Sequence, residues 1–184
     1  MRIIAGEWRG RRLASVGKGD PGAHLRPTTD RVRESLFNML AGGRFGDPFE
    51  GAVVLDLFAG TGALGLEALS RGALSATFVE NGRVGQRLIR ENVKTLDCSD
   101  RASVIGADAT RLPAGAPCSL VFLDPPYGKG LGARALEVAR TQGWIGAEAL
   151  IVWEESAPQV APEGYAALEA RRYGDTHVTV LRSR

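Results

Sequence analysis

The segment Asp124-Pro125-Pro126-Tyr127, directly after the apolar run 120–123, combines a carboxylate, a rigid backbone and an aromatic ring. Its two prolines restrict the backbone and prevent a helix, so the Asp124 carboxylate and the Pro125 carbonyl can both face one ligand. Two adjacent acceptors match the two N–H donors of an exocyclic amine, and a tyrosine ring can stack on a base, a contact worth about 1–3 kcal/mol. The same run could be only a rigid loop, but its place after a strand predicts chemistry on an amino nitrogen, with these four residues in the catalytic role.

A glycine-rich turn follows the apolar run 53–58. Gly60, Gly62 and Gly65 match the pattern G-x-G-x-x-G, and Glu80 lies twenty residues after Gly60. Such a turn lets the backbone approach a ligand closely, and a carboxylate at the next strand end can bind two vicinal ribose hydroxyls. A dinucleotide and S-adenosylmethionine both present that ribose, so Glu80 does not separate the two ligands.

Asp56 favours one of these ligands, because it precedes the glycine turn. A carboxylate there repels a pyrophosphate and attracts the ammonium end of S-adenosylmethionine. The alternative is an aspartate that only caps or packs. Asp108 follows the third apolar run and could accept a hydrogen bond from an adenine amino group, so Asp56, Glu80 and Asp108 would converge on one crevice. Methyl transfer from a sulfonium needs alignment rather than a nucleophile or a metal.

From residue 52 onward, apolar runs alternate with helical segments, which indicates βαβ units and a mostly parallel sheet in an α/β fold. A Gly174-Asp175 turn near the end of the chain suits an antiparallel hairpin. The predicted strands are 53–58, 76–80, 102–106, 119–124 and 148–153, the helices are 63–71, 83–96 and 131–141, and the hairpin joins 167–173 to 177–182.

The N-terminal third is an extension of this core. Residues 2–5 and 11–16 are β-prone, 17–27 is rich in Gly and Pro, and a helix should begin near residues 28–30 and end at Gly42-Gly43. Val32, Leu36, Phe37 and Leu40 form its apolar stripe, and Arg31 and Arg33 lie off that stripe. Residues 1–44 hold nine Lys or Arg against four acids, and the rest hold fourteen against seventeen. A basic end suits a phosphate backbone, but it could also be a solvated tail.

Length and composition limit the class of protein. The chain of 184 residues fits one domain, 1–184, with an extension at 1–44 and a core at 52–184. It has no apolar run near the roughly 20 residues of a membrane helix, and its first residues do not resemble a signal peptide. Cys98 and Cys118 stand apart, without neighbours at metal-ligand spacing. We expect a cytoplasmic protein with unpaired thiols, no metal and no membrane partner.

Together with the N-terminal third, these motifs resemble the RsmD family of bacterial 16S ribosomal RNA guanine-N2 methyltransferases, within the class I methyltransferases. The resemblance spans nearly the whole chain and rests on residues 1–6, 8–11, 26–34, 56–68 and 124–127. It implies a Rossmann-like seven-stranded sheet, S-adenosylmethionine as cofactor, and a guanine amino group of 16S rRNA, in an assembling or assembled small ribosomal subunit, as substrate. We expect a monomer.

The resemblance also implies residue roles, and it assigns none to residues 114–118 or to the C-terminal hairpin. The implied cofactor site comprises Asp56, Phe58, Ala59, Gly60, Thr61, Gly62, Glu80, Asp108 and Ala109. The implied RNA contacts are Arg9, Arg11, Arg12, Arg26, Thr28, Arg31 and Arg33. Trp8 could also stack on RNA, although an aromatic between basic residues can equally cover a core edge.

Three alternatives remain open from sequence. An amino methyltransferase acting on adenine N6 or on a glutamine amide would use the same Asp-Pro-Pro-Tyr geometry. An NAD-dependent oxidoreductase would use the glycine turn but not Asp124. A non-enzymatic RNA-binding factor could keep the fold and leave its RNA unmethylated.

Overall fold

A seven-stranded sheet with the strand order β3-β2-β1-β4-β5-β7-β6 forms the centre of the molecule. The computed structural model describes residues 1–16 and 29–184. Strands β1 to β5 are parallel, and β7 pairs antiparallel with both β5 and β6. The strands are β1 (Val53–Leu57), β2 (Ser75–Val79), β3 (Ala102–Ile105), β4 (Cys118–Leu123), β5 (Ile145–Glu155), β6 (Tyr165–Tyr173) and β7 (Thr176–Ser183).

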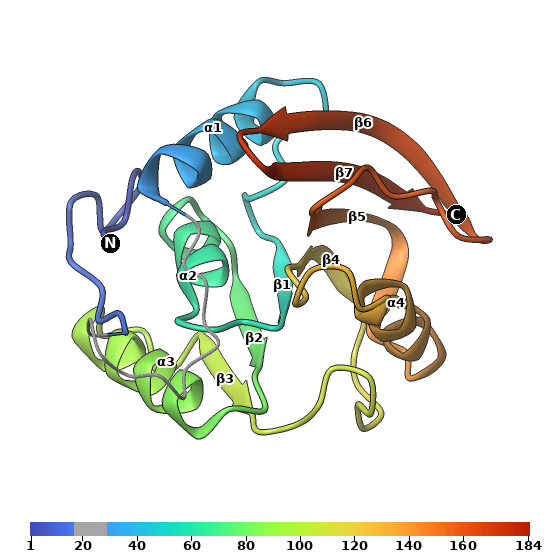
Figure 1. Ribbon diagram of the computed structural model, residues 1–184. Coiled ribbons are helices and arrows are strands. Elements are labelled where there is room, and N and C mark those ends of the chain that lie inside the picture. The colour runs from blue at the N-terminus through green and yellow to red at the C-terminus, as the bar shows by residue number, and fades with distance from the viewer. Residues whose placement is uncertain (17–28) are drawn as a thin grey trace.

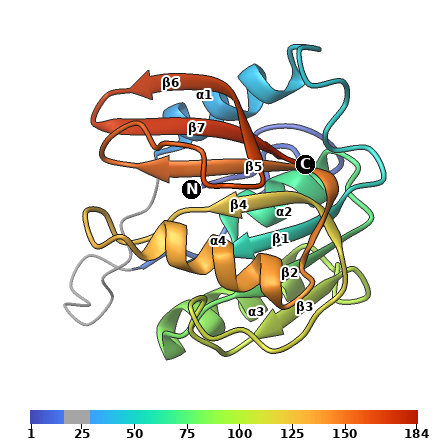
Figure 2. The same cartoon turned by 90° about the vertical axis from the view of Figure 1, so that its right-hand side faces the viewer.

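Helices cover both faces of the sheet (Figures 1 and 2). Helices α1 (Asp30–Ala41), α2 (Ala63–Ser70) and α3 (Arg83–Thr95) lie on one face, and α4 (Leu131–Thr141) lies on the other. Alternate residues of each central strand enter the two cores: Val54 packs with α1 to α3, and Leu55 packs with α4. Burial on both faces explains why the strands appear in the sequence as nearly continuous apolar runs.

The predicted mostly parallel sheet with a terminal hairpin is confirmed. The strand and helix bounds agree within two residues, except that β5 begins three residues earlier than predicted, at Ile145. The β-prone pieces at 2–5 and 11–16 do pair with each other, but over too few residues to form strands. They share an antiparallel bridge between Arg2 and Arg12, with hydrogen bonds from Ile3 N to Arg11 O (2.9 Å) and from Leu13 N to Met1 O (3.1 Å). The loop predicted at 17–27 lies outside the described residues, and the division into one domain stays a prediction.

The first residues of the chain, here called the N-terminal arm (residues 1–16), are held on α2 by buried polar groups. The carboxylate of Glu67, which has no exposed surface, accepts the backbone N–H groups of Ile4 (2.8 Å) and Ala5 (3.0 Å). Ser70 Oγ accepts from Trp8 N at 3.0 Å and donates to Ala5 O at 2.6 Å. A buried carboxylate and a buried hydroxyl would be costly without hydrogen-bond partners, and the backbone of the arm supplies those partners. The arm is therefore attached to α2 by side-chain hydrogen bonds and not by a strand ladder.

Trp8 belongs to this attachment, because it is buried and the Arg101 guanidinium lies 4.8 Å from its ring centroid. Of the two roles that the sequence allowed for Trp8, covering a core edge is therefore the correct one. Its ring is not exposed for stacking on RNA.

The tight contact between Gly6 and α2 gives a stability prediction. Gly6 has φ +83°, and a Cβ at this position would lie 1.8 Å from Ser70 O. Gly10 has φ +84° with nothing within 4 Å, so Gly10→Ala carries only the cost of its backbone conformation. We expect Gly6→Ala to cost at least about 2 kcal/mol more than Gly10→Ala, with about 2–4 °C of Tm lost per kcal/mol. Equal Tm losses in thermal unfolding would contradict the docking of the arm.

Candidate functional site

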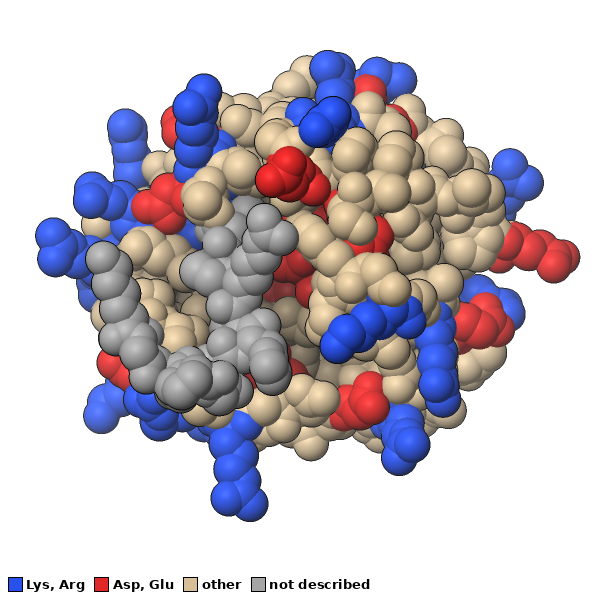
Figure 3. Space-filling model, viewed as in Figure 1, with Lys and Arg blue, Asp and Glu red and all other residues tan. Residues whose placement is uncertain are grey.

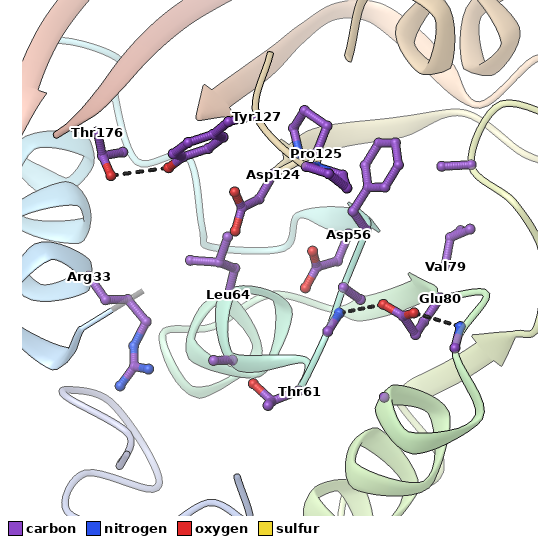
Figure 4. Close-up of a pocket in the computed structure, with 18 of the residues that line it drawn as sticks. Arg33, Asp56, Thr61, Leu64, Val79, Glu80, Asp124, Pro125, Tyr127 and Thr176 are labelled. Atoms are coloured by element: carbon purple, nitrogen blue, oxygen red, sulfur yellow. Dashed lines mark hydrogen bonds between the residues drawn. The ribbon is translucent and has the colours of Figure 1, made fainter. Parts of the chain in front are cut away.

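A cavity of about 700 Å³ opens at the carboxyl ends of β1, β2 and β4. Strands β1 and β4 are neighbours although two strands separate them in sequence, and the carboxyl edge of such a switch point is where α/β sheets bind ligands. The volume lies in the range of about 300–1,000 Å³ for small-molecule sites. Acidic side chains are visible in the hollow at the centre of this face (Figure 3), and Figure 4 shows the residues that line it.

Asp56 lies in the cavity wall near the end of β1 and is 1% exposed. One carboxylate oxygen accepts the Gly65 N–H at 2.9 Å. Burial raises the pKa of Asp56 well above its ordinary value, the Gly65 hydrogen bond opposes the rise, and nearby Asp124 and Glu80 add to it. An ionised carboxylate in this position therefore needs a positive partner.

The glycine turn and Glu80 form one hydrogen-bonded unit. Glu80, 8% exposed, accepts Gly60 N–H at 2.8 Å on one oxygen and Gly82 N–H at 2.7 Å on the other (Figure 4). Each carboxylate oxygen keeps further acceptor capacity, so Glu80 can still bind a pair of hydroxyl groups in the cavity. Gly65 is required by packing, because a Cβ there would lie 2.5 Å from the Phe78 ring and 3.1 Å from the Asp56 carboxylate.

Phe58, between Asp56 and the glycine turn, has φ +60° and lines the cavity. A bulky residue in this region costs about 1–3 kcal/mol, and such strain concentrates at ligand sites. Ala59, Gly60 and Thr61 also line the cavity, whereas Gly62 supplies the positive φ that begins α2.

The segment Asp124-Pro125-Pro126-Tyr127 follows β4 directly and lines the same cavity. In Figure 4 the carboxylates of Asp124 and Asp56 both point into it. The Tyr127 hydroxyl and Thr176 Oγ1 are 3.1 Å apart, and the buried Glu155 carboxylate accepts Gly128 N–H at 3.1 Å. The end of β5 and the start of β7 thus hold the carboxyl end of the loop, and at its other end Asp124 N donates to Leu57 O of β1 at 3.4 Å. These contacts, together with the two prolines, make the acceptors and the ring of the loop rigid.

Arg33 is placed differently from the sequence expectation. It is 1% exposed and lies on the packed stripe of α1, because positions 33, 36, 37 and 40 follow the 3-4-7 spacing of one helix face. Its guanidinium donates to Arg2 O and to Asp30, and the side chain lines the cavity. Burial lowers the pKa of Arg33, while Asp30 and Glu67 raise it. Arg33 is therefore part of the cavity wall and does not lie on the outer surface.

Asp108 does not line the cavity, although its neighbours Ala107 and Ala109 do. Its carboxylate accepts from Thr110 N and Thr110 Oγ1, both at 2.8 Å, and these bonds lower its pKa. The aspartate thus closes a local turn after β3, and the expectation that its side chain enters the crevice is not met. A sequence cannot show which of three neighbouring residues points inward.

The other basic residues that were predicted to contact RNA and that the structure describes are outside the cavity. Arg9, Arg11, Arg12 and Arg31 are exposed, and Arg11 donates to Thr95 O at 2.5 Å. Arg26 and Thr28 fall outside the described residues.

The sequence reasoning missed the turn between β6 and β7. Tyr173, Gly174, Asp175 and Thr176 line the cavity opposite the glycine turn, and Met1 of the arm lines it as well. Because β7 runs antiparallel to β5, this turn lies at the carboxyl edge of the parallel strands. The Gly174-Asp175 motif alone indicates only a hairpin. The pairing of β7 with β5 is the additional information that places this turn at the cavity.

Comparison with known proteins gives consistent matches. The family model described as conserved hypothetical protein 95 matches residues 1–182. A curated Escherichia coli K12 protein named ribosomal RNA small subunit methyltransferase D is 46% identical over 165 residues, covering 88% of this chain and 78% of the relative. A Haemophilus influenzae protein of the same name is 38% identical over 182 residues, covering 95% of this chain and 89% of the relative.

A solved Escherichia coli structure called "Putative methyltransferase yhhF" matches with a TM-score of 0.83 and 38% identity, covering 100% of this chain and 97% of the other. The fold is therefore that of the Rossmann-like methyltransferases, as the sequence predicts.

The raised pKa of Asp56 predicts how stability depends on pH. Because the folded pKa is above the ordinary 3.8, the stability contributed by the protonated carboxyl is complete below pH 3.8 and is lost as pH rises through the folded pKa. Asp56→Asn keeps an acceptor for Gly65 N–H but cannot ionise. We expect its Tm to exceed that of the wild type by an amount that grows between pH 4.5 and pH 8.

Thermal unfolding of the ligand-free proteins across this range measures the difference. Asp100→Asn, at an exposed position, controls for the loss of one negative charge. A pH-independent difference for Asp56→Asn would contradict the buried, ionising carboxylate.

Proposed function

We propose that this chain, which belongs to the RsmD family, is a methyltransferase that uses S-adenosylmethionine. It transfers the methyl group to the exocyclic N2 amino group of a guanine in small-subunit ribosomal RNA. The observation that carries the proposal is the rigid Asp124–Tyr127 loop beside buried Asp56 at one switch-point cavity. The names of the relatives support ribosomal RNA as the substrate.

The residues of the cavity fit S-adenosylmethionine better than they fit a dinucleotide. Asp56 is buried without a cationic partner among its described hydrogen bonds and ion pairs, and an ammonium or sulfonium would favour its charged form. Glu80, braced by two backbone N–H groups, is suited to the ribose hydroxyls. A pyrophosphate would instead meet three carboxylates, those of Asp56, Glu80 and Asp124. When bound, the cofactor supplies a methyl group on a positively charged sulfur.

The Asp124–Tyr127 loop is suited to hold the amine. The Asp124 carboxylate and the Pro125 carbonyl can accept its two N–H groups, which directs the nitrogen lone pair toward the methyl group. The Tyr127 ring, fixed through its hydroxyl by Thr176, offers a face for a base taken out of its stack. A methylated amino nitrogen would have to lose one proton, and the Asp124 carboxylate would accept it.

The remaining cavity residues have supporting roles in this proposal. Phe58, Ala59, Gly60, Thr61 and Ala109 line the cofactor part of the cavity. Arg33 is better suited to a ligand inside the cavity than to the RNA backbone outside it. We further propose that the substrate is an assembling or assembled small subunit, because the short arm offers only a small surface for selecting protein-free RNA. The enzyme is proposed to act as a monomer in the cytoplasm.

The proposal predicts the effect of removing the Asp124 carboxylate. Radiolabelled methyl transfer to small ribosomal subunits that lack this modification, followed by nucleoside digestion and mass analysis, should give N2-methylguanosine with the wild type. Asp124→Ala should lower the rate at least about 100-fold, because an acceptor used in the transition state is gone. Its affinity for S-adenosylmethionine should change far less.

Two controls sharpen this experiment. Tyr127→Phe keeps the ring and should retain most transfer, and Asp100→Asn changes an exposed acid remote from the cavity and should retain all of it. If the label were found in N6-methyladenosine, the target base would be adenine and not guanine. Cofactor binding without transfer to any RNA would refute the proposed activity.

A further inference from the structure

The outward face of α3 carries a row of cations that the arguments above do not use. Arg83, Arg87, Arg90 and Lys94 are all exposed and follow the spacing 0, 4, 7 and 11. At 3.6 residues per turn they fall within an arc of about 60° and extend over about 16 Å. The opposite side of the helix is buried through Gly85, Leu88, Ile89, Asn92 and Val93. These four residues are called the α3 row below.

The α3 row is unfavourable for the helix itself. Arg83–Arg87 and Arg90–Lys94 are like-charge pairs at i,i+4, each destabilising by about 0.2–0.5 kcal/mol. Arg83 is the first residue of α3, where the helix dipole disfavours a cation, and no acid occupies the first turn. Partial compensation comes from Glu91, 3.9 Å from Arg87, in a pair that is more than half exposed. Helix stability therefore does not account for the row.

The α3 row connects two surfaces that the proposed reaction uses. At one end Arg83 lines the cavity, and at the other end Arg11 of the N-terminal arm donates to Thr95 O, the last residue of α3. Arg9 and Arg12, also exposed, belong to the same arm. In Figure 3 basic side chains project along the left and lower-left edge, over the arm and α3. The α3 row therefore lies between the arginines of the arm and the cavity.

We infer that the α3 row binds the phosphate backbone of the RNA strand whose base enters the cavity. This inference rests on the proposed function and adds to it where the strand runs. Four cations along about 16 Å suit a linear polyanion, whose neutralisation releases counterions and makes binding depend on salt. The contacts are to phosphates, so they position the strand and add no base preference.

The test removes three charges that do not line the cavity. Arg87→Gln, Arg90→Gln and Lys94→Gln are combined, because Gln is a good helix former and leaves the buried face intact. The matched control combines Arg134→Gln, Arg140→Gln and Arg184→Gln, which are exposed and lie on α4 or at the chain end. Affinity for small ribosomal subunits and for protein-free 16S rRNA is measured at several salt concentrations, together with affinity for S-adenosylmethionine.

The row variant should bind both RNA samples about tenfold more weakly at moderate salt, with a slope of log K against log salt shallower by about 2. Its affinity for S-adenosylmethionine and the affinities of the control should match the wild type. A row variant with the affinity and slope of the wild type would overturn the inference and leave the proposed function standing. A wild type that binds neither RNA sample would overturn both.

Discussion

The burial of acidic side chains at one edge of the sheet is the constraint on which the rest of the site depends. Asp56 and Glu80 are almost fully buried, and Asp124 lies across the switch point from them. Burial raises the pKa of the Asp56 carboxyl, and the nearby Asp124 and Glu80 add to the rise, so the charged form of Asp56 is costly without a positive partner. Backbone N–H groups of Gly60, Gly65 and Gly82 provide part of the compensation. The negative charge that these N–H groups do not compensate gives this edge a negative potential, which would attract a cationic ligand.

A second set of buried polar contacts joins the N-terminal arm to this edge. The Asn92 side chain accepts from Ala14 N at 2.6 Å and donates to Thr61 O at 3.0 Å, so one residue of α3 contacts both the arm and the glycine turn. Glu67 and Ser70 hold the start of the arm on α2, the helix that the same turn begins. The arm, α2 and α3 therefore form one support for the cavity wall, and loosening the arm should disturb ligand binding as well as stability.

Much of this arrangement could be predicted because parallel strands put their carboxyl ends together. Once β1 and β4 were recognised as buried strands, Asp56 and Asp124 had to end near one edge, whichever helices covered them. Three features could not be predicted in this way. The face of α1 formed by Leu36, Phe37 and Leu40 is as predicted, but in its first turn Arg33 and not Val32 is the buried residue. Asp108 is held away from the cavity by a local turn, and the contribution of Thr176 depends on β7 pairing with β5. Each is set by tertiary contacts rather than by local pattern.

The central claim is that buried carboxylates select a cationic adenosine ligand over an anionic one that shares its ribose. Calorimetric titration of the wild-type protein with S-adenosylmethionine and, separately, with NAD tests this claim most directly. The account predicts saturable binding of one S-adenosylmethionine per chain and no saturable binding of NAD over the same concentration range. Binding of NAD with equal or higher affinity would contradict it.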